Sequence, residues 1–502
     1  MEVWEYEYEK RRKARPVDFE EDPSDWSGFA SIIEDRNKLI GMLWENQVPG
    51  SRAPESLYLE MVQAWSNRGY DVSEAEELVW EGLEALKEKD YRRLEVISAR
   101  VRQALRQAPK DPDHPYWQFN NPVTWEEIKA SFPSLNKDSS NGSAHVNGNN
   151  QKDDIDHQLD LPEINLSDDE LRRRIESGWL GQIAGGAYGT ALEGYTGEVL
   201  REVYGDRLDY YVKEPETYND DITFQIVFLR ALEEVDAAAG NAPEAGKSGI
   251  NASLTSADIA DQWLELIPFG WSAEYIALEN LRRGIYPPES GSFDNFFSEW
   301  IGAQMRGMVC GFIAPGKPLE AARYAYLDGI VSHEKNGVYG EIHSAVLTSL
   351  AFIYDDTREI LEKSREFIPE GSQFVHYFDL ALEAAREVSR KGDNHLAAWQ
   401  AMEDELKRYN WIHTYPNMVA VVNSLWYCEN DFGRAMRILA DCGMDVDCNA
   451  GEVGSVIGVM NPGTLDEKWT KPFNNRLQTY LPGFEEIKIS DLAEWTFSLA
   501  RR

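Results

Sequence analysis

Two acidic pairs are the residues of this chain with the clearest capacity for chemistry. Asp445 and Asp447 follow Gly443 and precede Cys448. Aspartates two positions apart do not share a helix face, so they converge on one point only from a turn or from the start of a helix. Carboxylates in that position suit a hard divalent cation such as Mg²⁺. An acidic helix cap without an ion is the alternative interpretation, and this pair alone does not decide between them.

The second acidic pair lies far upstream, in the sequence Asn219-Asp220-Asp221-Ile222. It too opens an apolar periodic segment, which predicts a helix that continues through Phe224. Crowded carboxylates repel one another unless a cation neutralises them. Two helix starts of this kind could together hold two metal ions, and their oxygen ligands suit Mg²⁺ or Mn²⁺.

A glycine-rich segment supplies a third motif, GWLGQIAGGAYGTALE, from Gly178 to Glu193. With the two acidic pairs after it, the chain resembles the ADP-ribosylglycohydrolases, in which a GxxxGDxxGxxxE-like helix precedes TDDT-like and DxDT-like metal motifs. The resemblance runs from about Ile164 to about Gly463. It implies an orthogonal helical bundle, two Mg²⁺ ions with Mn²⁺ as the alternative, and removal of ADP-ribose from a modified side chain or related acceptor.

The resemblance also implies roles for particular residues. Glu193 corresponds to a carboxylate near the anomeric carbon, where it could activate water or protonate the leaving group; an exposed charge at a helix end is the alternative. The implied metal ligands are Asn219, Asp220, Asp221, Asp445, Asp447 and Cys448. The implied substrate contacts are Gly302, Gln304, Arg306, His333, Asn336 and Tyr339, and a helix cap is the alternative for His333.

Four positions depart from the family pattern. Gly186 stands where the family usually has Asp, and Asn219 and Ile222 replace the two threonines of the first metal motif. An amide oxygen can still bind Mg²⁺, whereas Ile offers no ligand atom. Cys448 replaces a threonine, and a neutral thiol is a poor ligand for a hard ion. These differences bear on the inner ligand shell and on the substrate.

Helices must position all of these residues, because the chain shows helical periodicity and neither sustained alternation nor a βαβ rhythm. We therefore expect an all-α protein. Its 502 residues exceed one ordinary domain. Residues 1–134 read as a small helical accessory domain that contacts a protein partner, and 166–502 as the catalytic domain. Residues 135–165 between them have too few apolar side chains to order themselves and are predicted to be a flexible linker. The polar, glycine-punctuated segment 333–341 is predicted to lie between helices.

Charge and composition narrow the class of partner. With 87 acidic against 50 basic residues, the net charge of −37 argues against binding to a nucleic-acid backbone. No apolar run approaches a membrane span, and the N-terminal sequence lacks the apolar core of a signal peptide. We therefore expect a cytoplasmic protein, with no membrane partner, whose four cysteines are reduced thiols.

Three functions remain open on these grounds. The first is a Mg²⁺-dependent ADP-ribosyl hydrolase, and the second is a hydrolase of a small N-ribosyl metabolite or nucleoside-like compound. The third is a non-catalytic ADP-ribose-binding protein. Four clustered aspartates with no cation would repel one another, which argues against the third. The general negative charge opposes an anionic substrate, so metal ions and helix N-termini would have to offset it.

Overall fold

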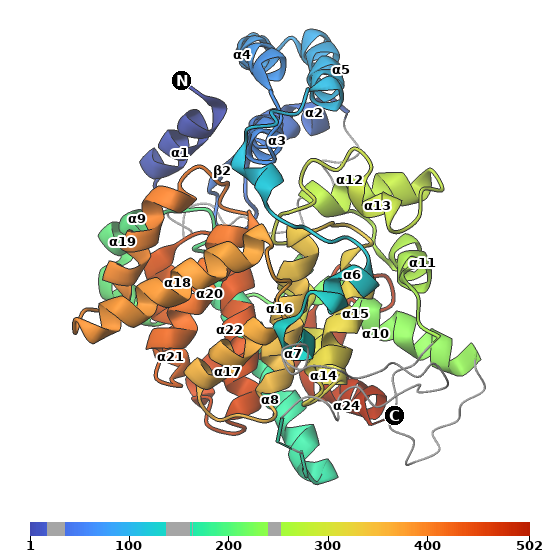
Figure 1. Cartoon of the computed structure of the whole chain (residues 1–502), viewed down its shortest axis with the longest axis vertical. Helices are drawn as coiled ribbons and strands as arrows, with labels where there is room; N and C mark the ends of the chain where they lie inside the picture. The colour runs from blue at the N-terminus through green and yellow to red at the C-terminus, as the bar shows by residue number, and fades with distance from the viewer. Residues whose placement is uncertain (18–35, 137–160, 163, 239–252, 502) are drawn as a thin grey trace.

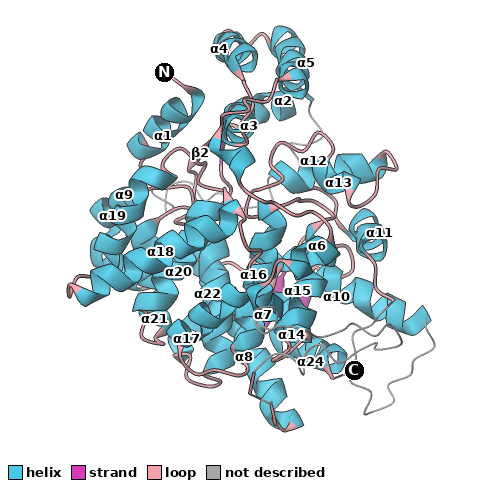
Figure 2. Cartoon of the chain, in the orientation of Figure 1, coloured by secondary structure: helices cyan, strands magenta, loops and turns pink. Residues whose placement is uncertain are grey.

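The computed structural model describes residues 1–17, 36–136, 161–162, 164–238 and 253–501. Helices account for nearly all regular structure in these ranges (Figures 1 and 2), which confirms the expected all-α class. The described residues contain two small antiparallel sheets, each of two strands. No described helix combines the length and apolar character needed to cross a bilayer. Most of the predicted linker lies outside the described residues.

The helices of the N-terminal segment are α1 (Val3–Lys13), α2 (Arg36–Trp44), α3 (Leu57–Asn67), α4 (Ser73–Lys87), α5 (Tyr91–Gln107), α6 (Trp125–Ala130) and α7 (Pro133–Asn136). Those of the first half of the C-terminal segment are α8 (Asp168–Gly189), α9 (Gly197–Tyr204), α10 (Asp220–Ala238), α11 (Ser256–Leu266), α12 (Ser272–Arg282), α13 (Glu289–Ser292), α14 (Met308–Ile313), α15 (Pro318–Gly329) and α16 (Asn336–Leu350). The remaining helices are α17 (Thr357–Ser364), α18 (Gln373–Arg390), α19 (His395–Leu406), α20 (Thr414–Tyr427), α21 (Phe432–Cys442), α22 (Val446–Met460), α23 (Glu467–Thr470) and α24 (Ile489–Ala500). The strands are β1 (Asn46–Gln47), β2 (Pro54–Glu55), β3 (Arg476–Gln478) and β4 (Glu486–Lys488).

Helices α8 and α22 form the central pair of the C-terminal segment, and their backbones touch. A Cβ added at Gly185 would lie 2.0 Å from the carbonyl oxygen of Ala450, and one at Gly189 would lie 2.2 Å from Cα of Asp447. Only glycine fits at such distances. The contact positions rise along α8 as they fall along α22, so the helices are antiparallel. This packing brings the end of α8 to the start of α22.

The N-terminal segment packs on the C-terminal segment, with α1 to α5 at the top of Figure 1. Arg68 donates from Nη1 to Oγ of Ser298 at 2.9 Å and forms an ion pair with Glu334. The hydroxyl of Tyr116 donates to Oε1 of Glu299 at 2.7 Å. Buried apolar residues of both segments form one hydrophobic core. The assignment of residues 1–134 and 166–502 to separate domains stays a prediction.

The predicted loop over residues 333–341 is wrong in its second half. Helix α16 begins at Asn336, so residues 336–341 are helical. A Cβ added at Gly337 would lie 2.4 Å from the carbonyl oxygen of Ser298, and one at Gly340 would lie 2.6 Å from Oγ1 of Thr414. The glycines that read as loop residues instead allow α16 to approach its neighbours closely.

Candidate functional site

The sequence-predicted carboxylates meet in one pocket, where the end of α8 and the starts of α10 and α22 converge. Glu193 follows α8, Asp220 begins α10, and Asp445 caps α22. The described residues that line this pocket are Val48, Pro49, Glu55, Glu193, Asp220, Asp221, Trp271, Ser272, Glu274, Ile301, Gly302, Met305, Trp411, Ile412, Asp445, Asp447 and Cys448.

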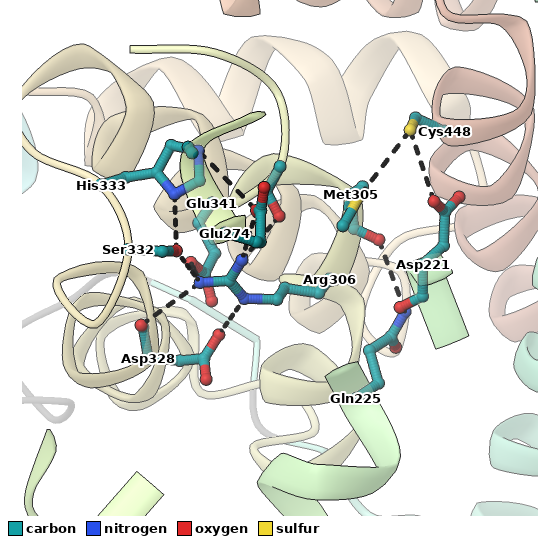
Figure 3. A network of polar contacts seen from close by, with 12 residues as sticks. Asp221, Gln225, Glu274, Met305, Arg306, Asp328, Ser332, His333, Glu341 and Cys448 are labelled. Carbon is teal, nitrogen blue, oxygen red and sulfur yellow. Dashed lines mark hydrogen bonds and ion pairs between the residues drawn. The ribbon is translucent and has the colours of Figure 1, made fainter. Parts of the chain in front are cut away.

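Three of the predicted metal ligands lie within reach of one ion. Ligand atoms of Asp445, Asp447 and Cys448 all lie within 4.8 Å of one another. The thiol of Cys448 donates to Oδ1 of Asp221 at 3.5 Å, which joins the two acidic motifs (Figure 3). Burial first, and then the charge of Asp221, raise the pKa of the Cys448 thiol well above its ordinary value, so it is neutral.

Several oxygens of the acidic motifs are buried and accept no hydrogen bond from the described residues. They are Oδ1 of Asn219, Oδ2 of Asp221, Oδ1 of Asp445 and Oδ1 of Asp447. A buried acceptor without a donor costs about 1–3 kcal/mol, and more when it is charged. Burial, followed by the charges of Asp447 and Asp220, also raises the pKa of Asp221 well above its ordinary value. A divalent cation would satisfy these oxygens and neutralise their repulsion, so the residues present fit such an ion.

The turn before α22 is held by an asparagine that the sequence did not indicate. Oδ1 of Asn417 accepts from the backbone N–H of Asp445 at 3.1 Å and from Nδ2 of Asn449 at 2.8 Å. Its own Nδ2 donates to the carbonyls of Trp411 at 2.7 Å and His413 at 2.9 Å. Asn417 belongs to an apolar helix, where a single amide gives no recognisable pattern.

The structure shows what surrounds three of the positions that depart from the family pattern, Gly186, Asn219 and Ile222. Ile222 is buried at 2% exposure and belongs to the hydrophobic core. The hydroxyl of Thr223, which follows Ile222, donates to the carbonyl oxygen of Asn219 at 2.7 Å, so it forms a hydrogen bond to the backbone four residues earlier. A Cβ added at Gly186 would lie 3.1 Å from Nδ2 of Asn219. Asn219 therefore lies in the space beside Gly186, where the family usually carries a carboxylate.

Glu193 is a buried member of the pocket, with a side chain 7% exposed. This excludes the interpretation of Glu193 as an exposed helix-end charge. Burial first, and then the charges of Asp447 and Asp445, raise its pKa well above the ordinary range. A carboxyl group in this environment favours its protonated form and can act as a proton donor.

Two of the predicted substrate residues belong to a buried polar network beside the pocket (Figure 3). Arg306 donates from Nη1 to Oε1 of Glu274 at 3.2 Å and from Nη2 to Oγ of Ser332 at 2.9 Å, and it pairs with Asp328. Nδ1 of His333 lies 2.7 Å from the same serine hydroxyl. Burial and the nearby guanidinium of Arg306 hold the pKa of His333 well below its usual value, so it is neutral. Of the residues that contact Arg306 or His333 in this way, Glu274 lines the pocket, whereas Ser332 and Asp328 are not among its lining residues.

The other predicted substrate residues divide in the same way. Gly302 lines the pocket, whereas Gln304, Asn336 and Tyr339 are not among the lining residues described above. Their donors bind, in that order, Oε2 of Glu452 at 2.8 Å, Oε1 of Glu299 at 3.2 Å and the carbonyl oxygen of Pro122. A substrate role for these residues and for Arg306 and His333 stays a prediction, since their polar groups bind protein atoms here.

Part of the pocket wall consists of residues that no sequence motif indicated. Val48, Pro49 and Glu55 come from the N-terminal segment, and Trp271 precedes α12. Oε1 of Glu55 accepts a hydrogen bond from Nε1 of Trp271 at 2.8 Å, and burial raises the pKa of Glu55 to about 7. These residues are far from the acidic motifs in sequence and follow no spacing that could have joined them to the site.

Fold and pocket together define an all-α protein in which buried carboxylates converge between helix termini. The family model described as ADP-ribosylglycohydrolase matches residues 167–501, and the chain therefore belongs to the ADP-ribosylglycohydrolase family. This confirms the resemblance and supports a hydrolase activity of the glycohydrolase type. A solved structure titled "ADP-ribosylglycohydrolase-related protein complex" is similar over 66% of this chain and 99% of that chain, with 17% identity and a TM-score of 0.44. The comparison with curated proteins finds no match.

Proposed function

We propose that this chain is a Mg²⁺-dependent hydrolase that cleaves a ribosyl glycosidic bond and releases ADP-ribose from a modified side chain or related acceptor. The observation that carries the proposal is the pocket itself. Glu193 shares it with four aspartates, three of which hold a buried oxygen without a hydrogen-bond donor among the described residues. A binding protein without catalysis would have no evident use for a protonated carboxyl group beside a cation site.

Two Mg²⁺ ions, or Mn²⁺ as the alternative, would be held by Asn219, Asp220, Asp221, Asp445 and Asp447. Such ions supply charge stabilisation and orient hydroxyl groups and water. The neutral thiol of Cys448 is a poor ligand for them, and its hydrogen bond to Asp221 instead orients that carboxylate. Asn417 likewise orients the turn that carries Asp445, because its side chain accepts a hydrogen bond from the backbone N–H of Asp445.

Glu193 would act at the bond that breaks. Burial is the largest cause of its raised pKa, and this environment suits a group that donates a proton to the departing group and then takes one from the attacking water. The apolar wall of Ile301, Met305 and Ile412 limits competition from bulk water around these groups.

Mg²⁺ should stabilise the folded protein, because an ion that binds only the folded state raises its melting temperature. Asp447→Ala should abolish this stabilisation and the hydrolysis, while the exposed Asp404→Ala serves as a control. The measurements are thermal melting with and without Mg²⁺ and hydrolysis of ADP-ribosylated protein. An unchanged melting temperature in excess Mg²⁺ would contradict the metal site.

Glu193→Gln separates catalysis from binding in the same assays. It should lower kcat by about 10²–10⁴-fold, the usual contribution of a general acid or base. Mg²⁺ and ADP-ribose should still bind, since the metal ligands are intact. Wild-type turnover by this variant would exclude the catalytic role, and ADP-ribose binding with no turnover of any conjugate by the wild type would favour the non-catalytic binding protein.

The charge of the pocket favours a second candidate, a hydrolase of a small N-ribosyl metabolite or nucleoside-like compound. Every ionisable side chain other than Cys448 among the lining residues is a carboxylic acid, and none is Lys, Arg or His. A diphosphate would therefore meet no cationic side chain there, whereas a neutral riboside avoids the repulsion. Parallel assays on ADP-ribosyl conjugates and on uncharged N-ribosides decide between the two candidates.

A further inference from the structure

A short hairpin of the N-terminal segment forms part of the candidate active site. Strands β1 and β2 pair in antiparallel register, with Asn46 opposite Glu55. Val48, Pro49 and Glu55 of this hairpin line the pocket. The family model begins only at residue 167, so these wall residues lie outside the region that the family shares.

The hairpin touches the chain on both sides of Glu193. A Cβ added at Gly50, where φ is +91°, would lie 2.4 Å from Cγ2 of Thr190. A Cβ added at Gly194, where φ is +77°, would lie 2.5 Å from Cβ of Ala53. Glycine is needed at both positions because of the backbone conformation and the close approach. The hairpin therefore fixes the segment that carries Glu193 and faces the space around it.

Glu55 joins the hairpin to a second wall of the pocket. Its Oε1 accepts the indole N–H of Trp271 at 2.8 Å, and its Oε2 lies 3.4 Å from Nδ2 of Asn46. The residue is 2% exposed, so water competes little for these hydrogen bonds. Trp271 lies directly before α12 and also lines the pocket. One buried carboxyl group thus accepts a hydrogen bond from the indole N–H of a tryptophan more than two hundred residues away.

We propose that this hairpin completes the active site and that Glu55 is a positioning residue, which fixes Trp271 as the pocket wall that selects the leaving group. The selection follows from position. Glu193 acts at the scissile bond under the proposed function, and the hairpin brackets Glu193, so its wall adjoins the group attached to the anomeric carbon. The leaving-group role rests on that proposed function, whereas the closure of the pocket by the Glu55–Trp271 pair does not.

Closure can be tested without any substrate through Cys448, which lines the pocket. Trp271→Phe and Glu55→Leu each remove the same hydrogen bond from opposite sides. Each should raise the rate of Cys448 alkylation by N-ethylmaleimide about tenfold, which matches the loss of about one hydrogen bond. Glu55→Gln keeps the acceptor oxygen and should largely restore the slow rate, and the double variant should be no faster than either single one.

Internal controls separate local opening from unfolding. Cys310 and Cys428 are buried and do not line the pocket, so their alkylation should not change. Glu77→Gln, on the exposed face of α4, controls for a charge change in the same segment. Equal acceleration at all cysteines would show global destabilisation in place of local opening and would overturn the positioning role. So would an unchanged rate at Cys448 in Trp271→Phe.

The leaving-group role is tested with ribosyl substrates that differ only in the departing group. Trp271→Phe and Glu55→Leu should change KM by different factors for different leaving groups, while their affinity for Mg²⁺ stays that of the wild type. An equal factor for every substrate would overturn the selection. If the wild type hydrolyses none of them, the proposed function fails, and the alkylation result still decides whether the hairpin closes the pocket.

Discussion

At the residue scale, buried polar side chains of this protein differ in whether the protein itself satisfies them. Arg306 binds Glu274, Asp328 and Ser332, so its charge is used within the fold. Asp445 and Asp447, by contrast, each keep a buried oxygen that no described donor reaches. The first pattern is typical of a structural charge network, and the second is typical of a cation-binding site.

A buried histidine that does not line the pocket, His343, allows a prediction about pH. Nε2 of His343 lies 3.0 Å from Oγ of Ser364, and that hydroxyl donates to the carbonyl oxygen of Leu361 at 2.8 Å. The hydroxyl must therefore accept from His343, which is neutral with its proton on Nε2. Burial lowers the pKa of His343 to about 3. Unfolding frees the ring to protonate near its ordinary pKa of about 6.5.

Because the pKa of His343 is lower in the folded state, its contribution to stability is complete above about pH 6.5 and is lost as the pH falls toward about 3. Between pH 7.5 and pH 5 the wild type should lose about 2 kcal/mol more unfolding free energy than His343→Gln, which keeps a donor for Ser364. Urea titrations at both pH values measure this difference, with the exposed His376→Gln as the control. Parallel losses in wild type and His343→Gln would contradict a neutral, buried histidine.

At the element scale, the contact between α8 and α22 determines where Glu193 meets the aspartates. Gly185→Ala would place a methyl group 2.0 Å from a backbone oxygen of α22, so the helices must separate. Overpacking of this kind costs about 1–3 kcal/mol or more. Gly433→Ala is the matched control. The atom nearest to its added Cβ would be Oδ1 of Asp431 at 3.5 Å, and alanine stabilises a helix by up to about 1 kcal/mol relative to glycine. The melting temperature and the urea midpoint should therefore fall for Gly185→Ala and rise for Gly433→Ala. A Gly185→Ala protein as stable as the wild type would refute the tight contact.

Helices α10 and α22 show what a sequence can predict. The acidic pairs preceded apolar periodic segments, and the structure begins α10 at Asp220 and α22 at Val446. Local sequence is enough for that, because caps and periodicity act within a few residues. The glycines at 337 and 340 misled the prediction, since glycine serves both loops and close helix contacts, and only tertiary structure distinguishes the two.

The pocket wall shows why the rest of the site could not be predicted. Strands β1 and β2 have two residues each, too few to display a period. The contact of Glu55 with Trp271 joins distant segments through one hydrogen bond, which leaves no trace in spacing or composition. Polar residues such as Gln304 and Tyr339 matched a family pattern, yet nothing in their sequence reveals that Glu452 and Pro122 accept their hydrogen bonds.

At the scale of the whole molecule, the N-terminal segment shares its core with the C-terminal segment. Trp65 packs edge-on against Phe296 with ring centroids 5.0 Å apart, and Phe132 meets Phe367 at 6.1 Å. Glu299 accepts a hydrogen bond from the hydroxyl of Tyr116 in the same interface. A covalent break between the segments therefore need not separate them, because burial and hydrogen bonds hold them together.

Residues 161–502 produced alone should consequently be poorly soluble, although they contain the whole region matched by the family. Phe296 and Phe367 are 2% and 3% exposed in the intact chain, and each would lose part of the about 1.5–3 kcal/mol that full burial of a large apolar side chain contributes. Co-expression with residues 1–136 should restore a soluble complex, measurable as co-elution in size-exclusion chromatography and as a single thermal transition. A chain cut by protease between residues 137 and 160 should elute as the same complex. If residues 161–502 were instead monodisperse and melted like the intact chain, the N-terminal segment would be an accessory domain, and its hairpin would matter only for the shape of the pocket.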